Sequence, residues 1–207
     1  MADETPRPGR LIAVDGSRGA DVAAEADALA KRLRRKGVPC GISRWDASGL
    51  FADLLVAGPE TVVVSPRMLA LLYAADLVFR LRWEIEPAVA EGRVVIAAPY
   101  VHTATAVGVG LGLPEAWLRE VLRRAPTADV LRCARERKPA RGWRRRPTRG
   151  YGEFCATVLD FAPAGMTRRT SRARAMEWLA AAGEIAGQVR RKVIVERLVA
   201  EGRRSPG

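Results

Sequence analysis

Short apolar runs that alternate with segments of helical spacing constrain this chain more than any other feature. The pattern predicts strands over 11–15, 38–43, 94–98 and 129–133, and helices over 21–36, 66–90 and 114–124. Residues 61–64 and 153–161 are further candidate strands, and residues 171–202 read as one long helix rich in Ala and Arg. Because strands that alternate with helices of this length build βαβ units, the sequence predicts an α/β fold with a mostly parallel sheet.

Positive charge is concentrated in the last third of the chain. The 207 residues carry 35 Lys and Arg against 23 Asp and Glu, a net charge of +12. Residues 1–131 hold 16 basic and 16 acidic side chains, so the whole excess lies beyond them. Residues 132–149 alone combine eight Arg and one Lys with one Glu. This distribution excludes a uniformly basic protein that coats nucleic acid and indicates a neutral body with a basic appendage.

The remaining composition favours a cytoplasmic protein without a metal or a membrane span. Cys40, Cys133 and Cys155 are odd in number and widely spaced, and His102 is the only histidine, which predicts free thiols and no metal site. The N-terminal residues lack the apolar run of a secretory signal. Residues 94–114 carry no charge over 21 positions. Their prolines, threonines and glycines favour a strand, a turn and a helix over a bilayer helix.

The junction after the first predicted strand is the first place to look for a ligand, because parallel α/β sheets bind ligands where their strands end. A phosphate-binding loop at this place reads Gly-x-x-x-x-Gly-Lys-Ser/Thr. Its backbone amides surround the phosphates, its lysine supplies charge, and its hydroxyl holds Mg²⁺. In this chain Asp15 and Gly16 begin the junction and Gly19 follows.

Five segments in register resemble the thymidylate kinase family over residues 10–131. The junction 15–30 is similar to the family's Glu-Gly-x-Asp-Gly-x-Gly-Lys-Ser/Thr-Thr-x-x-x-x-Leu-Ala, and the turn 43–49 is similar to Thr-Arg-Glu-Pro-Gly-Gly. Residues 71–76 are similar to Leu-Leu-Phe-Ala-Ala-Asp, and residues 85–92 are similar to Ile-x-Pro-Ala-Leu-x-x-Gly. Tyr100-Val101 stands at the end of the family's Asp-Arg-Tyr-Val. The resemblance implies a three-layer P-loop NTPase-type sheet flanked by helices. It also implies one domain over 10–207 after a polar tail at 1–9, with a lid-like segment at 132–150 and a closing helix at 171–202.

The phosphate-binding side chains of that family are missing here, so the loop is degenerate. Asp21 replaces the second glycine, Val22 the lysine and Ala23 the Mg²⁺-binding hydroxyl. The other departures are Leu77 for the Arg after Ala-Ala-Asp, Ala98-Pro99 for Asp-Arg, and Val107-Gly108 for a Tyr-Gln pair near the base. Phosphoryl transfer depends on positioned charge, so these losses predict that no catalytic residue remains. Asp21 would also repel a phosphate.

A few residues outside the lost positions could still hold a nucleotide or another anion. Arg18 is either an anion contact or a solvated loop side chain. Arg44 matches a family arginine and is either a phosphate ligand or half of a surface ion pair. Tyr73 stands where the family stacks a ring on the nucleobase, and core packing suits it equally well. Tyr100 is the retained tyrosine, and His102 reads as a structural residue.

The arginine-rich segment 132–150 has three interpretations. It is a retained lid without a working loop beneath it, a patch for nucleic acid or an acidic partner, or a solvated flap. Trp143 and Tyr151 would supply stacking in the second interpretation. Its candidate anion-binding residues are Arg141, Arg144, Arg145, Arg146 and Arg149. Arginines at the start of the closing helix oppose its dipole, which also suggests an external anion.

These observations favour a thymidylate-kinase-like protein that has lost phosphoryl transfer and works by binding or regulation without a cofactor. One alternative is an active dTMP kinase that uses ATP and Mg²⁺ at a site rebuilt from Arg18, Arg44 and the lid arginines. The other is a module that binds nucleic acid or an acidic partner. The resemblance also implies a homodimer through the helices around Ala-Ala-Asp. There the residues Leu69, Leu72, Phe79 and Trp83 would form an apolar face, unless a monomer buries them.

Overall fold

The computed structural model describes residues 9–16, 19–49, 65–134, 168–186 and 191–203. Four strands, β1 (Arg10–Asp15), β2 (Cys40–Arg44), β3 (Val94–Ala98) and β4 (Val130–Cys133), form one sheet in the order β2-β3-β1-β4. All three strand pairs are parallel, and Ile12 on β1 pairs with Ile96 on one side and Val130 on the other. The predicted α/β class and its parallel sheet are confirmed.

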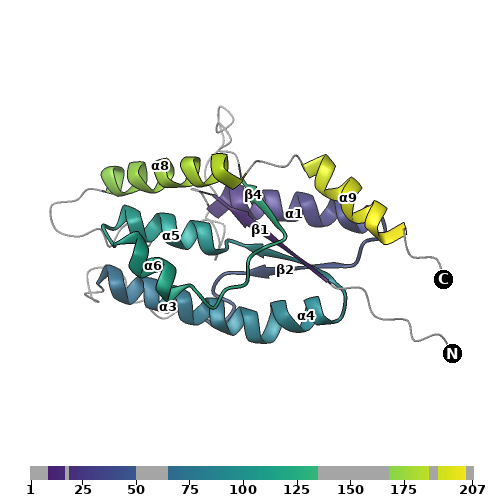
Figure 1. The fold of residues 1–207 in the computed structure, drawn as a ribbon, viewed down its shortest axis with the longest axis horizontal. Helices are drawn as coiled ribbons and strands as arrows, with labels where there is room; N and C mark the ends of the chain where they lie inside the picture. Colours follow the sequence, from purple (N-terminus) through teal and green to yellow (C-terminus); the bar gives the residue numbers. More distant parts are fainter. Residues whose placement is uncertain (1–8, 17–18, 50–64, 135–167, 187–190, 204–207) are drawn as a thin grey trace.

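Helices cover the sheet. They are α1 (Gly19–Arg35), α3 (Pro66–Arg80), a π-helical turn (Leu81–Ile85), α4 (Glu86–Ala90), α5 (Val101–Gly110), α6 (Glu115–Val121), α8 (Arg168–Ala186) and α9 (Arg191–Arg203). Figure 1 shows α3, α5 and α8 as neighbours, with α5 in contact with both of the others. The crossovers from β1 to β2 and from β3 to β4 run in opposite directions along the sheet. Right-handed connections therefore place α1 and α5 on opposite faces.

The core lies where the central strands meet the apolar stripe of α1. Ile12 and Ile96 are fully buried, as expected of strands covered on both faces. Helix α1 turns Ala26, Leu29 and Leu33 toward them. It ends where the sequence predicts, because Gly37 adopts a φ of 75° and Val38 N donates a hydrogen bond to Leu33 O.

Two predicted helices differ in detail from those observed. The pattern over 66–90 is helical throughout, but the π-helical turn Leu81–Ile85 separates α3 from α4. The single helix predicted over 171–202 is wrong, because α8 and α9 are separate helices that contact different partners. Helix α8 packs on α5 and helix α9 packs on α1. The strands predicted at 61–64 and 153–161 fall outside the described residues.

The uncharged run 94–114 forms β3 and α5, joined through residues 99 and 100, as its composition predicts. Both elements are largely buried in the protein itself. In the part of the chain that the structure describes, no helix combines the length and the apolar character needed to cross a membrane.

Candidate functional site

The carboxyl ends of β1, β2 and β3 lie at one edge of the sheet. Asp15 ends β1, Arg44 ends β2 and Ala98 ends β3. The loop after β1, the turn 45–49 and the start of α5 follow these strands, so Asp15, Arg44 and Tyr100 lie at this edge. Arg18, Arg141, Arg144, Arg145, Arg146 and Arg149 lie outside the described residues.

The Asp15 carboxylate faces into the protein and caps α5. Its Oδ1 accepts hydrogen bonds from the backbone N of Tyr100 at 2.7 Å and of Thr103 at 3.0 Å. These amides belong to the first turn of α5, where a negative charge also complements the helix dipole. Oδ2 lies 3.5 Å from Nδ1 of His102, and neither atom has a hydrogen-bond partner among the described residues. Asp15 therefore serves the fold through a contact 85 residues away in sequence.

Thr103 binds the backbone at the start of the loop that follows β1, a role that sequence reasoning missed. Its Oγ1 accepts a hydrogen bond from Gly16 N at 3.0 Å. A Cβ on Gly16 would lie 2.9 Å from Cγ2 of Val22, so the glycine permits a close approach between the loop and α1. Thr103 is buried on α5, and nothing in its sequence neighbourhood indicates this contact.

The positions that match the phosphate-binding residues of the thymidylate kinase motif lie in the first turns of α1 in this structure. Gly19 begins the helix, and Asp21 is buried close to it. Val22 is 1% exposed and belongs to the main hydrophobic core. Ala23 is half-buried and packs against the same core. Val22 and Ala23 therefore stabilise the packing of α1 on the sheet.

Arg44 pairs with a neighbouring carboxylate on the surface. Its Nη2 lies 2.5 Å from Oδ1 of Asp27 on α1, and both side chains are exposed. Of the two interpretations of this arginine, the structure therefore displays the surface ion pair. The partly buried pair of Glu25 and Arg132 joins α1 to β4 in the same way, with 2.5 Å between Oε1 and Nε.

A buried carboxylate on α3 holds the turn that follows β2. Asp76, which is 0% exposed, accepts hydrogen bonds from the backbone N of Asp46 and of Ser48, both at 3.0 Å. The Ser48 hydroxyl donates a third at 2.8 Å. Asp76 is the aspartate of the Ala-Ala-Asp segment, so the resemblance located it without indicating what it binds.

Arg80, one helical turn beyond Asp76, is also 0% exposed. Its Nε donates to Ser43 Oγ at 3.0 Å, and its Nη2 donates to the carbonyls of Ser43 and Pro99, both at 3.0 Å. Nη1 lies 3.9 Å from Asp76 Oδ2. The guanidinium thus ties α3 to the ends of β2 and β3. A charged pair at i and i+4 on the apolar face of a helix was the available signal for this network, and sequence reasoning missed it.

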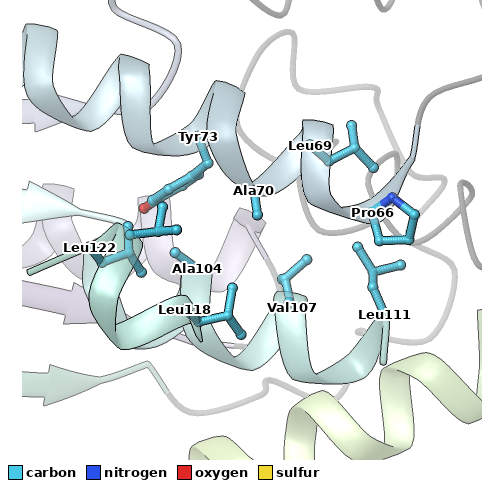
Figure 2. Close-up of a pocket in the computed structure, with 11 residues that line it drawn as sticks. Pro66, Leu69, Ala70, Tyr73, Ala104, Val107, Leu111, Leu118 and Leu122 are labelled. Atoms are coloured by element: carbon cyan, nitrogen blue, oxygen red, sulfur yellow. The ribbon is translucent and has the colours of Figure 1, made fainter. Parts of the chain in front are cut away.

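Tyr73 borders an apolar pocket between α3, α5 and α6 (Figure 2). Its hydroxyl donates to the carbonyl of Tyr100 at 2.9 Å, and the Tyr100 hydroxyl donates to Pro126 O at 2.8 Å. Burial raises the pKa of the Tyr100 phenol above its ordinary value. The pocket contains about 350 Å³ of space, including its open mouth. Its walls are Pro66, Leu69, Ala70, Tyr73, Ala104, Val107, Gly108, Leu111, Leu118, Val121 and Leu122.

The described cysteines are free thiols. Cys40 and Cys133 are free, and burial raises the pKa of both thiols. Cys155, Trp143 and Tyr151 fall outside the described residues. Within the described ranges no cluster of three or more His, Cys, Asp and Glu side chains could hold a metal ion.

Known proteins resemble part of this chain. It is 29% identical over 132 residues to a probable thymidylate kinase of Thermococcus gammatolerans, which covers 59% of this chain and 64% of that protein. It is 32% identical over 125 residues to a thymidylate kinase of Thermomicrobium roseum, covering 58% of each. A probable thymidylate kinase of Caldivirga maquilingensis is 31% identical over 124 residues. The chain spans about three fifths of the length of these relatives. No protein-family model matches it.

Proposed function

We propose that this chain, a relative of the thymidylate kinases, has lost phosphoryl transfer and acts as a binding or regulatory protein. The observation that carries the proposal is the first turn of α1. Where the resemblance requires a lysine, Val22 is packed in the core, and Asp21 lies buried beside it. A positioned cation in such a site contributes roughly a thousandfold or more to the rate of phosphoryl transfer.

The surroundings of Tyr73 support the same proposal. A nucleobase carries donors and acceptors on its edges, and burying them unpaired is unfavourable. Here the Tyr73 hydroxyl is already bonded to Tyr100 O, and the other pocket-lining side chains are apolar. Val107 and Gly108, which replace the Tyr-Gln pair, lie on the wall formed by α5. This pocket therefore offers poor recognition of a nucleoside monophosphate.

The alternative of a rebuilt kinase site receives little support from the described arginines. Arg44 is paired with Asp27, and Arg80 is fully buried in its network with Ser43 and Pro99. Neither guanidinium is free to meet a transferred phosphoryl group without breaking an internal contact. A rebuilt site would have to rely on Arg18 and the arginines of 132–150.

The test is an assay of the purified chain with ATP, Mg²⁺ and dTMP, in which formation of ADP and dTDP is followed by chromatography. The Thermomicrobium roseum thymidylate kinase serves as the positive control. We expect less than about a thousandth of the control's turnover. Turnover within roughly tenfold of the control would overturn the proposal. Loss of that turnover in Arg18→Ala and Arg44→Ala would then establish the rebuilt site.

We further propose a homodimer, through a face that differs from the one the sequence suggests. Leu69 is buried in the chain's own core and Leu72 packs against it, so these two residues are unavailable. The large apolar side chains exposed on α3 and the π-helical turn are Met68, Leu71, Val78, Phe79 and Trp83. Sedimentation should show a dimer for the wild type and a monomer for Phe79→Glu/Trp83→Glu. A wild-type monomer would contradict this assembly.

A further inference from the structure

The last two turns of α1 present a dense group of positive charges to solvent. The basic end of α1 is defined as Lys31, Arg32, Arg34 and Arg35 together with Lys36, which directly follows the helix. All five are exposed, and no acidic residue interrupts them. None of them forms an ion pair with a residue that the structure describes, whereas Arg10, Arg44, Arg80, Arg93, Arg119, Arg123, Arg132 and Arg197 all do. The basic end of α1 is therefore a concentration of uncompensated charge.

A rigid frame holds these side chains. Leu33, in the middle of the group, is 0% exposed and anchors the helix in the core. Gly37 closes the helix, with Gly37 N donating to Arg34 O at 3.0 Å. Nη2 of Arg34 donates to Cys40 O at 3.3 Å, which connects the helix end to β2. The backbone that carries the positive charges is therefore held in place by the core and by β2.

The group contains more positive charges than are needed to complement the helix dipole. One or two cations near a helix C-terminus complement its dipole. Here Lys31 and Arg35 lie at the i, i+4 spacing at which like charges destabilise a helix, and Arg32, Arg34 and Lys36 add further positive charge beside them. Five of the 16 basic side chains in residues 1–131 lie within the six positions 31–36, although these 131 residues are neutral overall. An external anion would relieve the repulsion.

The basic end of α1 is separate from the candidate functional site. Helix α1 begins at Gly19, just after the carboxyl end of β1, and runs back past the sheet to Arg35. Strand β2 then begins at Cys40, at the amino edge. The group therefore lies at the opposite edge of the sheet from Asp15 and the degenerate loop, and its function does not depend on the proposed loss of catalysis.

The chemistry of the patch selects its partner. Insertion into a membrane needs large apolar side chains beside the charges. Among the described residues, the large apolar side chains that are exposed all lie between Met68 and Trp83, and none of them is on α1. The patch also has no aromatic ring to stack on a base. Three of its five members are arginines, whose planar forks match phosphate oxygens. We propose that the basic end of α1 binds the phosphate backbone of nucleic acid without reading its sequence.

The proposal is tested with the full chain and a fluorescein-labelled DNA duplex of about 25 base pairs, titrated over roughly 50 to 300 mM NaCl. Two unrelated duplex sequences should bind with equal affinity. Arg32→Gln/Arg35→Gln/Lys36→Gln should weaken binding by at least about tenfold and reduce the slope of log K against log salt by roughly 2 to 3. The matched control, Arg119→Gln/Arg123→Gln/Arg124→Gln, removes the same charge from exposed positions on and after α6. It should change the affinity by less than about threefold.

Several outcomes would overturn the proposal. They are no duplex binding by the wild type at the lowest salt, an unchanged salt slope in the first variant, and an equal loss in the control variant. Binding that is lost only in Arg144→Gln/Arg145→Gln/Arg146→Gln would transfer the activity to the arginine-rich segment. Binding to phosphatidylserine vesicles or to polyglutamate, but not to the duplex, would assign another class of partner. Thermal unfolding checks each variant, and Arg32→Gln/Arg35→Gln replaces the first one if it does not fold.

Discussion

The two edges of the sheet use charged side chains in opposite ways. At the carboxyl edge, Asp15, Asp76 and Arg80 are fully buried and bonded to backbone groups of distant segments. At the amino edge, the basic end of α1 is exposed and has no ion-pair partner among the described residues. The fold normally directs charge outward at the first edge to meet phosphates. Here that edge is held together by its own polar groups.

This difference shows that charged side chains at the edge of a sheet can serve the fold itself. A buried ionised group is tolerated only when hydrogen bonds and counter-charges surround it. A buried member of such a network can meet a ligand only if internal contacts are broken. Exposed charges contribute little to stability and remain available. Substitutions at the carboxyl edge should therefore affect folding, whereas substitutions at the basic end of α1 should affect binding.

The largest effect should follow from Arg80→Ala. Removing the guanidinium leaves the buried Asp76 carboxylate without its cation and two carbonyls without donors, so the free energy of unfolding should fall by about 3 to 5 kcal/mol. Urea denaturation measures this change. The control Arg82→Ala removes an exposed arginine from the adjoining helical turn and should cost less than about 0.5 kcal/mol. Equal losses in the two variants would remove the distinction between a buried network and surface charge.

A smaller loss is expected for Asp15→Ala, which uncaps α5. The backbone amides of Tyr100 and Thr103 would lose a charged acceptor, and the free energy of unfolding should fall by roughly 2 to 3 kcal/mol. Asp15→Asn keeps an acceptor and should lose about half as much. Asp27→Ala, which breaks only the exposed pair with Arg44, should cost less than about 1 kcal/mol. If Asp15→Ala were as mild as Asp27→Ala, the cap would not be structural.

Gly110→Ala examines the packing of α5, the helix that Asp15 caps. A Cβ there would lie 2.5 Å from the backbone oxygen of Ser171 on α8, so the two helices would have to move apart. We expect a loss of about 1 to 3 kcal/mol from overpacking, although alanine favours a helix over glycine by about 1 kcal/mol. Gly41→Ala meets nothing within 4 Å and is the matched control. A stabilised Gly110→Ala would contradict the close contact between α5 and α8.

The smallest effect concerns Cys40, beside the basic end of α1. Burial raises the pKa of its thiol, and the nearby Arg34 guanidinium partly lowers it again. Arg34→Gln should therefore raise this pKa further and reduce the thiolate fraction at pH 8. The rate of labelling by a thiol reagent should fall by roughly twofold. The measurement uses Cys133→Ser/Cys155→Ser, which leaves Cys40 as the only cysteine. Faster labelling after Arg34→Gln would show that the patch does not create a positive potential at this thiol.

Much of the fold could be predicted from local patterns. The strands and α1 lie within a few residues of their predicted positions, because apolar periodicity and a terminal glycine act over short distances. The division of 171–202 into two helices could not be predicted this way. Both halves have helix-forming composition, and only their packing on α5 and α1 separates them.

The candidate site was predicted less completely. The resemblance located Asp15, Asp76 and Tyr73, but not their partners. Thr103 and Arg80 were missed because their roles depend on contacts across the sheet edge, with Gly16, Ser43 and Pro99. The apolar face expected on α3 divides into buried and exposed residues for a similar reason. Leu69 and Phe79 look alike in sequence, and only the angular position of each on α3 decides that one is buried and the other exposed.

The sequence by itself determined the α/β class, the order of the elements in 10–133, the departure of the first junction from the Gly-x-x-x-x-Gly-Lys-Ser/Thr pattern and the cluster of cations at 31–36. Each of these is a property of residue type and local spacing. The tertiary structure alone decided which charges are available. It buried Asp15, Asp76 and Arg80 among the ends of β1, β2 and β3 and left the basic end of α1 in solvent. The physical reason is that pairing and desolvation depend on the neighbours that the fold brings together, and those neighbours lie far apart in the chain.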